Sequence, residues 1–304
     1  MIRIGHLSTA YHTSMVLMGM QKWVRDAKLE LKWELYSTGP RIIKALGRGD
    51  LDMGYVGLPP AIVGIDKGAR LKCVAGGHIE GTVIIAEMKY RSLEEQDYKT
   101  RATLEQFNCI GSPSRGSIHD VIIRDLLKKE GLSQRVAVKN YPWADLLVNA
   151  LEKGEIDAAI GTPSLTAVVI QGGVGRIIFQ PKELWPFNPS YGIVVKEEII
   201  KDFPRTIESF LRTHRKASAF IRKHPQGAAE IISKVIGVVD EEFVLTALGI
   251  SPRYCTSLPP EFIDATMVFV KMLRALRYIK KPLREEDIFD RSFIERVHPE
   301  AHHY

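Results

Sequence analysis

The chain has 304 residues, of which 45% are hydrophobic and 26% charged, a composition typical of a globular protein that excludes collagen-like, disordered and disulfide-scaffold chains. This length suits two domains of about 100–150 residues each. The net charge of +6 is scattered without a block of five like charges, so we expect no nucleic-acid partner. No apolar run approaches the roughly 18–20 residues that span a bilayer.

The first part of the chain alternates short apolar runs with amphipathic stretches. Strands are predicted at residues 2–7, 31–36, 53–56, 71–75 and 82–86. Helices are predicted at residues 13–27, 40–48 and 59–67. Strands that alternate with helices over short loops indicate parallel β-α-β units. Residues 87–105 are charged and less apolar, and we expect the chain to cross between domains there.

The same alternation then starts again. Strands are predicted at residues 107–111, 136–140, 156–160, 175–179 and 191–195. Helices are predicted at residues 117–130, 143–153 and 163–171. From residue 204 to about 277 the pattern is helical, with breaks near 224–225, 237 and 258–260. We expect the last stretch, 280–304, to be a loosely packed C-terminal segment.

A short motif occurs twice. The sequence ALxxGDLD at 45–52 recurs as ALxxGEID at 150–157, and each copy is followed by a short strand and then by a proline. A helix that ends at a glycine and turns through an acidic residue into a strand explains both copies. We interpret the repeat as a duplication, and two similar α/β halves predict a ligand cleft between them.

Three segments carry a resemblance to a known family. ALGRGDLDMGYVGLPPAIVGIDKGARLKCVAGG at 45–77 and PSRGSIHDVIIRDLLKKEGL at 113–132 resemble the extracytoplasmic solute-binding proteins of ABC importers for nitrate, taurine and alkanesulfonates. In the second segment, Gly116, Ser117 and His119 match that family's glycine-serine-histidine element at the start of a helix. RTIESFLRTHRKASAFIRKHPQGAAEIISKVIGV at 205–238 is similar to the family's C-terminal helical hairpin.

The resemblance implies an α/β, two-lobed, type II periplasmic-binding-protein-like fold with a C-terminal helical segment. By that resemblance, lobe 1 comprises residues 1–86 and 191–304, the latter with the C-terminal helices, and lobe 2 comprises residues 87–190. Intracellular enzymes of menaquinone and thiamine-pyrimidine biosynthesis resemble the same fold, although the cysteine cluster of the pyrimidine synthases is missing here.

Candidate binding loops follow from this fold, because ligands of open α/β sheets lie beyond the carboxyl ends of the strands, against helix N-termini. Free helix N–H groups and small hydroxyl residues bind anions well, but each hydroxyl alone is also explained as an N-cap. The candidate ligand-binding residues are Ser8, Thr9, Tyr11, His12, Ser37, Thr38, Gly57, His78, Ser114, Arg115, Gly116, Ser117, Trp143 and Thr162. The loop at 114–117 is expected to contribute most.

No metal, cofactor or catalytic residue is predicted. The three cysteines form no CxxC pair, and we expect them to be buried structural residues. His12, His78 and His119 come from three separate loops without metal-ligand spacing. One of them acting as an acid–base group is what the enzyme alternative requires.

The predicted function is therefore capture of a small organic anion (a sulfonate, a nitrate-like ion or a carboxylate) in an inter-lobe cleft, by a monomer that serves an ABC permease and ATPase. The alternative is a cytoplasmic enzyme of the same fold that acts on a small carboxylate in cofactor biosynthesis. The N-terminus does not look like a secretory signal. The protein is thus expected to be extracytoplasmic, periplasmic or at the cell surface, if a leader has been removed, and cytoplasmic otherwise.

Overall fold

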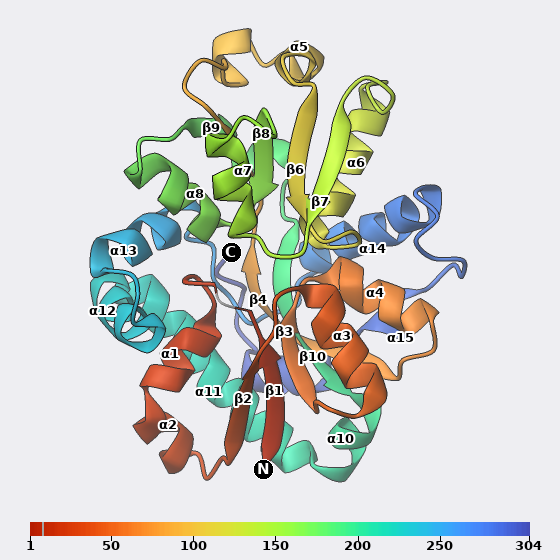
Figure 1. Ribbon diagram of the computed structural model, residues 1–304. Coiled ribbons are helices and arrows are strands. Elements are labelled where there is room, and N and C mark those ends of the chain that lie inside the picture. The colour runs from red at the N-terminus through yellow and green to blue at the C-terminus, as the bar shows by residue number, and fades with distance from the viewer. Residues whose placement is uncertain (8) are drawn as a thin grey trace.

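The structure, a computed structural model, describes residues 1–7 and 9–304 and is built around two separate five-stranded sheets (Figure 1). The strand order is β2-β1-β3-β10-β4 in the first sheet and β7-β6-β8-β5-β9 in the second. Helices cover both sheets, and the prediction of an α/β fold in two halves is confirmed.

The first sheet takes its strands from both ends of the chain. They are β1 (Ile2–His6), β2 (Leu31–Leu35), β3 (Met53–Val56), β4 (Leu71–Ile79) and β10 (Pro189–Lys196). Strand β1 pairs in parallel with β2 and β3, whereas β10 runs antiparallel to β3 and β4. The helices between these strands are α1 (Thr13–Gly19), α2 (Gln21–Asp26), α3 (Gly39–Arg48) and α4 (Leu58–Asp66).

The second sheet repeats this arrangement. Its strands are β5 (Val83–Ala86), β6 (Cys109–Pro113), β7 (Ala137–Tyr141), β8 (Ala158–Gly161) and β9 (Arg176–Phe179). Strand β6 pairs in parallel with β7 and β8, and β5 runs antiparallel to β8 and β9. The helical segments of this half are η1 (Glu94–Gln96), α5 (Thr100–Glu105), α6 (Ile118–Lys129), α7 (Leu146–Glu152), α8 (Pro163–Gln171) and α9 (Pro181–Leu184).

The rest of the chain is helical and returns to the first sheet. Its helices are α10 (Glu197–Asp202), α11 (Pro204–Lys223), α12 (Pro225–Ile236), α13 (Glu241–Ile250), α14 (Pro260–Ala275), α15 (Glu285–Ile288) and α16 (Ser292–Val297). Helices α11 and α12 pack on α1, and α13 reaches across to α8 of the second half (Figure 1). The C-terminal helices therefore contact both halves.

The pairing of β5 corrects two expectations about the boundary. We placed 82–86 in the first lobe and the crossing in the charged stretch 87–105, but β5 hydrogen-bonds only to strands of the second sheet among the described residues. The chain therefore passes between the sheets at 80–82 and returns at 180–188. The charged stretch belongs to the second half, where η1 and α5 lie on its outer end (Figure 1).

Two further expectations were wrong. The helix predicted at 13–27 is two helices, because the backbone at Met20 leaves the helical region (φ −91°, ψ 55°). The segment 280–304 is not loosely packed: Ile288 and Val297 are fully buried, and the Tyr304 hydroxyl donates to the carbonyl oxygen of Cys255 at 2.7 Å. Apolar residues in this segment complete the core below β4.

The repeated motif forms the same structure in both halves. Gly49 ends α3, and Gly154 lies in the turn after α7. Both adopt the left-handed backbone conformation, with φ 82° at Gly49 and 66° at Gly154. Glycine avoids the steric cost that other residues incur in this conformation. The N–H of Asp52 then donates to the carbonyl of Arg3, and the N–H of Asp157 donates to that of Cys109. Each motif thus fastens its strand to the parallel neighbour, β1 or β6.

Candidate functional site

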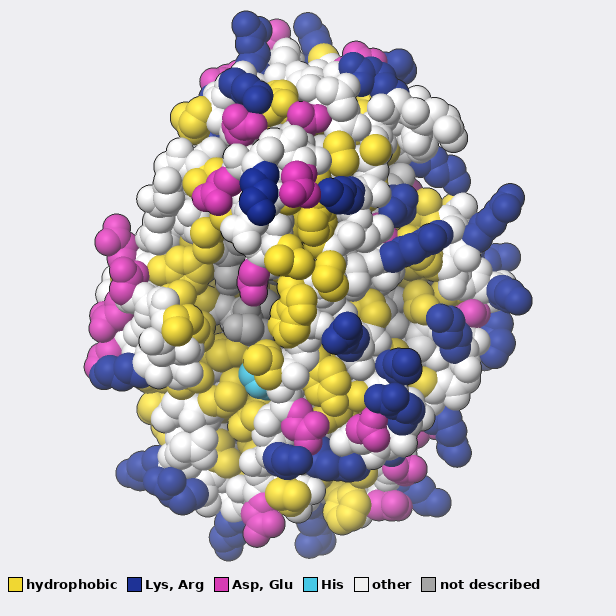
Figure 2. Space-filling model, in the orientation of Figure 1, with side chains coloured by type: hydrophobic (Ala, Val, Ile, Leu, Met, Phe, Trp, Pro, Cys, Tyr) yellow, Lys and Arg dark blue, Asp and Glu magenta, His cyan; other side chains and the backbone are white. Residues whose placement is uncertain are grey.

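A cavity of about 540 Å³ lies between the two halves. Its floor is made by loops after β1, β2 and β3 of the first sheet, and its roof by the starts of α6, α7 and α8 of the second. The face shown in Figure 2 is hollowed between the upper and lower halves, and hydrophobic side chains surround the hollow. Lys and Arg side chains lie mainly to the right of the hollow and towards the upper and lower ends of this face (Figure 2).

Helix N-termini converge on this cavity because both sheets present the carboxyl ends of their parallel strands to it. Helix α3 begins after Thr38 and α4 after Gly57, and neither N-cap residue makes a side-chain capping bond. Both residues line the cavity. The N-terminus of each helix carries a partial positive charge, so these two helix starts favour a negatively charged group. The N–H groups at the first helical positions are those of Gly39 and Leu58, because Pro40, Pro59 and Pro60 have no N–H.

Three polar side-chain atoms on the floor are buried without a hydrogen-bond partner among the described residues. They are the hydroxyls of Thr9 and Ser37 and the Nδ1 atom of His12. All three residues line the cavity. Buried polar groups are almost always paired, and leaving one unpaired costs about 1–3 kcal/mol. The three groups are therefore placed to be satisfied by a bound molecule.

The hydroxyls of the roof are used differently. The Ser117 oxygen accepts from the N–H of Asp120 at 3.2 Å, and the Thr162 oxygen accepts from the N–H of Leu165 at 3.3 Å. Both residues line the cavity while acting as N-caps of α6 and α8. A capping oxygen satisfies one of the free helix donors, so the roof offers fewer unpaired polar groups than the floor.

Charge is nearly absent from the wall. Asp145 is the one charged side chain among the described lining residues, and neither lysine nor arginine is found there. Burial lowers the pKa of His119 to about 4 and that of His12 well below its ordinary value, so both imidazoles are neutral at neutral pH. Any anion in this cavity is held by N–H groups, hydroxyls and neutral rings.

Most of the roof and one side of the cavity are apolar. These lining side chains come from the second half and from the segment around α13, and they are Trp143, Val148, Leu165, Val168, Ile236, Val238, Val239 and Phe243. Trp143 is 41% exposed and Val238 is 88% exposed. Large exposed apolar side chains around a cavity mark a surface that a ligand covers.

The structure brings nine of the predicted residues to the cavity. They are Thr9, Tyr11, His12, Ser37, Thr38, Gly57, Ser117, Trp143 and Thr162. His78 is fully buried behind the wall, where its Nδ1 pairs with the Ser190 hydroxyl at 2.9 Å and its Nε2 faces the carbonyl of Ser251. Ser8 lies outside the described residues.

The loop at 114–117 does not contribute as expected. Arg115 and Gly116 line a different cavity, between α3, α4 and α6, and Ser114 lines neither. The N–H of Gly116 donates to the Asp120 carboxylate at 2.9 Å, and the Arg115 guanidinium lies over the ring of Tyr278 at 5.5 Å. Of this loop, only Ser117 lines the cavity between the halves, so the positions of Ser114, Arg115 and Gly116 give no support to the expectation that the loop contributes most to ligand binding.

Sequence reasoning missed several lining residues. Asn149, Ser164 and Ser190 line the cavity with polar side chains, and Phe243 closes one side. Ser164 follows the predicted Thr162-Pro163 turn, so the helix start gave a local signal for it. Phe243 lies far along the chain and reaches the cavity only because α13 packs on α8, which no local pattern predicts.

Several side-chain hydrogen bonds join the halves, including those from Gln171 to the Thr246 hydroxyl and from Lys128 to the carbonyl of Ala275. The N–H of Ala10 donates to the Ser164 hydroxyl at 3.1 Å. On the other side of α6, the hydroxyl of Tyr278 donates to the Asp120 carboxylate at 2.6 Å. The cavity is therefore framed by hydrogen bonds that separation of the halves would break.

Two α/β halves around such a cavity form the two-lobed fold of periplasmic binding proteins. The alkanesulfonate-binding protein SsuA of Xanthomonas axonopodis pv. citri, solved with MOPS bound, superposes with a TM-score of 0.80 at 19% identity, over 96% of this chain and 98% of that one. The periplasmic nitrate-binding protein NrtA of Synechocystis PCC 6803 gives a TM-score of 0.79 at 12% identity, over 97% and 87%.

The chain belongs to the NMT1-like family, whose model matches residues 1–237. A candidate binding protein of Brucella abortus (strain 2308) is 24% identical over 247 residues, which cover 78% of this chain and 72% of the relative. The predicted resemblance to this group of solute-binding proteins is confirmed. Among the residues that the structure describes, no helix is long and apolar enough to cross a membrane.

Proposed function

We propose that this protein is the ligand-binding component of an ABC importer and that it captures a small organic anion between its halves. The observation that carries this proposal is the set of unpaired buried groups of Thr9, His12 and Ser37 beside the uncapped starts of α3 and α4. Donors of this kind suit a sulfonate or carboxylate without a cationic side chain.

The apolar roof narrows the class of anion. A cavity of about 540 Å³ exceeds what a nitrate ion fills, and nitrate alone would leave Trp143, Val148 and Leu165 uncovered. We therefore favour a sulfonate or carboxylate with an apolar body that lies against the roof. The relative that binds an alkanesulfonate supports this class of ligand.

We propose further that the halves are lobes that close over the ligand. Sheet pairing supports residues 1–79 with 189–304 as one lobe and residues 83–188 as the other. A ligand that contacts both lobes stabilises the closed state by its differential affinity. The protein acts as a monomer, outside the cytoplasm as the periplasmic relative does, and delivers its ligand to a permease and an ATPase.

A thermal-shift panel tests the ligand class. Aliphatic and aromatic sulfonates, MOPS among them, are compared with carboxylates of the same body, with nitrate and with neutral amides of the same body. A ligand at about 100 times its Kd stabilises the folded state by about 2.7 kcal/mol, so a sulfonate or carboxylate is expected to raise Tm and the amide is not. Stabilisation by the amide alone would overturn the anion assignment.

Small-angle scattering tests the closure. With a compound that raises Tm, the scattering of a monomer is expected to show a smaller radius of gyration. An unchanged profile at saturation would contradict closure while leaving the binding result intact.

A further inference from the structure

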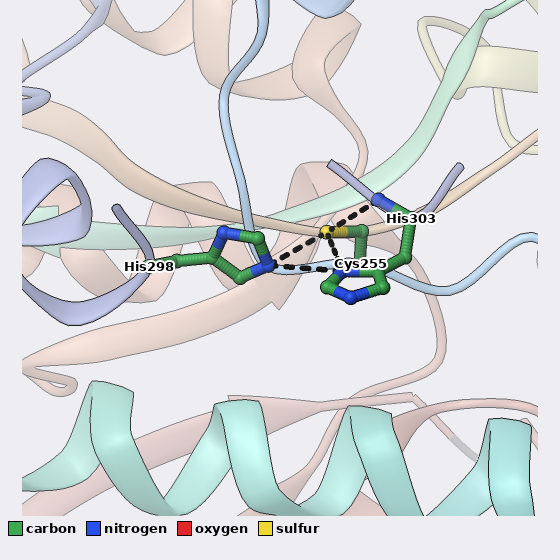
Figure 3. A group of neighbouring side chains, drawn as sticks. All are labelled: Cys255, His298 and His303. Atoms are coloured by element: carbon green, nitrogen blue, oxygen red, sulfur yellow. Dashed lines mark hydrogen bonds between the residues drawn. The ribbon is translucent and has the colours of Figure 1, made fainter. Parts of the chain in front are cut away.

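A second cluster of reactive side chains lies away from the cavity, at the C-terminal end of the chain. Cys255 comes from the segment between α13 and α14, His298 directly follows α16, and His303 lies in the tail (Figure 3). Cys255 is fully buried, His298 is 5% exposed and His303 is exposed. None of the three lines the cavity between the halves.

The three potential ligand atoms point toward one another (Figure 3). The Cys255 Sγ lies 3.3 Å from His298 Nε2 and 3.6 Å from His303 Nδ1, and the two nitrogens are 3.1 Å apart. Zinc bonds of about 2.3 Å to sulfur and about 2.0–2.1 Å to nitrogen, at tetrahedral angles, place neighbouring ligand atoms about 3.3–3.6 Å apart. The triangle of Sγ, Nε2 and Nδ1 thus has the size of one face of a zinc tetrahedron.

The surroundings of His298 orient it as a metal ligand. Its Nδ1 lies 3.2 Å from the carbonyl oxygen of Glu300. A carbonyl accepts only, so Nδ1 carries the proton and the lone pair of Nε2 faces the cluster. Metal-binding histidines almost always donate their other N–H in this way.

The surroundings of Cys255 favour a thiolate. The backbone N–H of His303 donates to its sulfur at 3.3 Å. A thiolate is the form of cysteine that binds metals.

A carboxylate stands beside the cluster. The Glu300 Oε1 lies 3.6 Å from His298 Nε2 and is ion-paired with Arg215. It places a second negative charge near His298, and a thiolate and a carboxylate together balance a divalent charge. The spacing of His298 and His303, with four residues between them, also falls within the range of three to five found in zinc sites.

We propose that Cys255, His298 and His303 bind one Zn²⁺ ion and leave a fourth coordination position open. Nothing in the family match or in the named relatives assigns this site. Cys255 is thereby given a ligand role in place of the purely structural one that the absence of a CxxC pair suggested.

The ion would fasten the C-terminal tail to the first sheet. The Tyr304 hydroxyl donates to the carbonyls of Cys255 and Ser257, and the N–H of Gly76 in β4 donates to Thr256 at 2.9 Å. A side chain at Gly76 would lie 2.1 Å from the Tyr304 hydroxyl, so the tail passes directly over β4. Because β4 ends where the chain crosses to the second half, the site secures the strand that leads into the crossing.

Metal titration of the full chain tests the proposal. Chelator-treated protein is titrated with Zn²⁺ against a competing chelator, and one equivalent is expected to bind and to raise Tm. With Co²⁺ in place of zinc, a thiolate-to-cobalt charge-transfer band is expected. Cys255→Ser, His298→Gln and His303→Gln are each expected to weaken zinc binding at least about 100-fold, which exceeds or equals the loss typical of outer-shell changes.

Two control variants show whether a loss of zinc binding is specific to the three proposed ligands. Cys109→Ser removes a partly exposed thiol outside the cluster, and His302→Gln removes the neighbour of His303, whose ring packs on Phe187 and Tyr304 instead. Both are expected to bind zinc within about threefold of the parent and to keep the cobalt band. The zinc titration and the cobalt spectrum of the wild-type protein test the site even if one of the variants fails to fold. Absence of stoichiometric zinc binding, a cobalt adduct without a thiolate band, or an equal loss in His302→Gln would overturn the site.

Discussion

The two halves of the molecule have the same sheet but different cavity walls. In each sheet, three parallel strands are followed by an antiparallel strand that the chain enters after crossing from the other half: β10 in the first sheet and β5 in the second. On the floor, the cavity-lining hydroxyls of Thr9 and Ser37 are buried and unpaired among the described residues, whereas on the roof those of Ser117 and Thr162 cap helices. The two halves therefore share a sheet topology, but the first half offers more unpaired polar groups to the cavity than the second.

The correspondence extends into the core. A Cβ atom on Gly5 in β1 would lie 2.5 Å from Leu51 and 3.1 Å from Ile42, and one on Gly111 in β6 would lie 2.4 Å from Ile156 and 2.7 Å from Leu147. Leu51 and Ile156 occupy equivalent positions of the two motif copies, and Ile42 and Leu147 each lie three residues before a copy. Each half thus lets a helix approach its central strand over a glycine, which supports the interpretation of the repeat as a duplication.

The largest expected effect tests the difference between the two cavity walls, at Thr9. Thr9→Val keeps the shape of the side chain and removes the buried hydroxyl that lacks a partner among the described residues. A hydrogen bond to a charged ligand contributes about 1.5–3 kcal/mol, so we expect a roughly 10- to 100-fold loss of affinity. Calorimetric titration measures it with a compound that raises Tm in the panel.

The free energy of unfolding is the control for Thr9→Val. Since valine replaces an unpaired buried hydroxyl, unfolding of the ligand-free protein is expected to be no easier than in the parent. A loss of stability together with unchanged affinity would show that the hydroxyl is structural and would contradict the polar-floor assignment.

The next prediction tests whether the helix packs on the central strand equally tightly in the two halves. Gly5→Val and Gly111→Val place atoms within 2.5 Å of side chains that have little room to move. Overpacking of this kind costs about 1–3 kcal/mol, and we expect the two losses of unfolding free energy to be alike. Denaturant unfolding measures both. Gly68→Ala, at a glycine with nothing within 4 Å but with φ 96°, reports the conformational cost alone.

A smaller effect concerns the two aspartates of the repeat. The Asp52 carboxylate accepts from the N–H and guanidinium of Arg3, and the Asp157 carboxylate accepts from two backbone N–H groups and from the Tyr90 hydroxyl. Burial would raise both pKa values, but these hydrogen bonds outweigh it and lower them below 3.8. Their stabilisation is therefore full above about pH 3.8 and is lost as the pH falls through the lowered values.

Asp52→Asn and Asp157→Asn are expected to lose about 1–2 kcal/mol of unfolding free energy at neutral pH. The difference from the parent should shrink as the pH falls below 3.8. Asp50→Asn is the matched control, because Asp50 is half exposed and, among the residues that the structure describes, its side chain pairs with Arg48 alone; a pair of this kind contributes little. A constant difference down to low pH would contradict the proposed linkage.

The fold was easier to predict from the sequence than the residues that line the cavity. The alternation of strands and helices, the repeat and the floor loops at Thr9, Ser37 and Gly57 are local patterns, and the sequence predicted them. The reach of Phe243 to the cavity depends on packing between distant helices. The turn of Arg115 toward Tyr278 depends on where the C-terminal segment lies. A correctly predicted helix start therefore does not determine whether the neighbouring loop residues face the cavity or point away from it.

The smallest effect sharpens the comparison at Ser117, which lines the cavity but caps α6. Ser117→Ala removes the oxygen that accepts from Asp120 N–H, so the unfolding free energy is expected to fall by about 1 kcal/mol. The affinity for the anion is expected to change less than about threefold, since that oxygen already accepts a hydrogen bond from the helix.

The variant Ser117→Asp separates the capping role from a ligand-binding role. Aspartate caps a helix as well as serine and should restore stability, but its carboxylate at the cavity wall should repel an anion and lower the affinity more than alanine does. Tm without ligand and calorimetric affinity, measured on both variants, decide between a cap and a ligand contact: an affinity loss in Ser117→Ala as large as that of Thr9→Val would make the roof hydroxyl a binding group and remove the asymmetry between the walls.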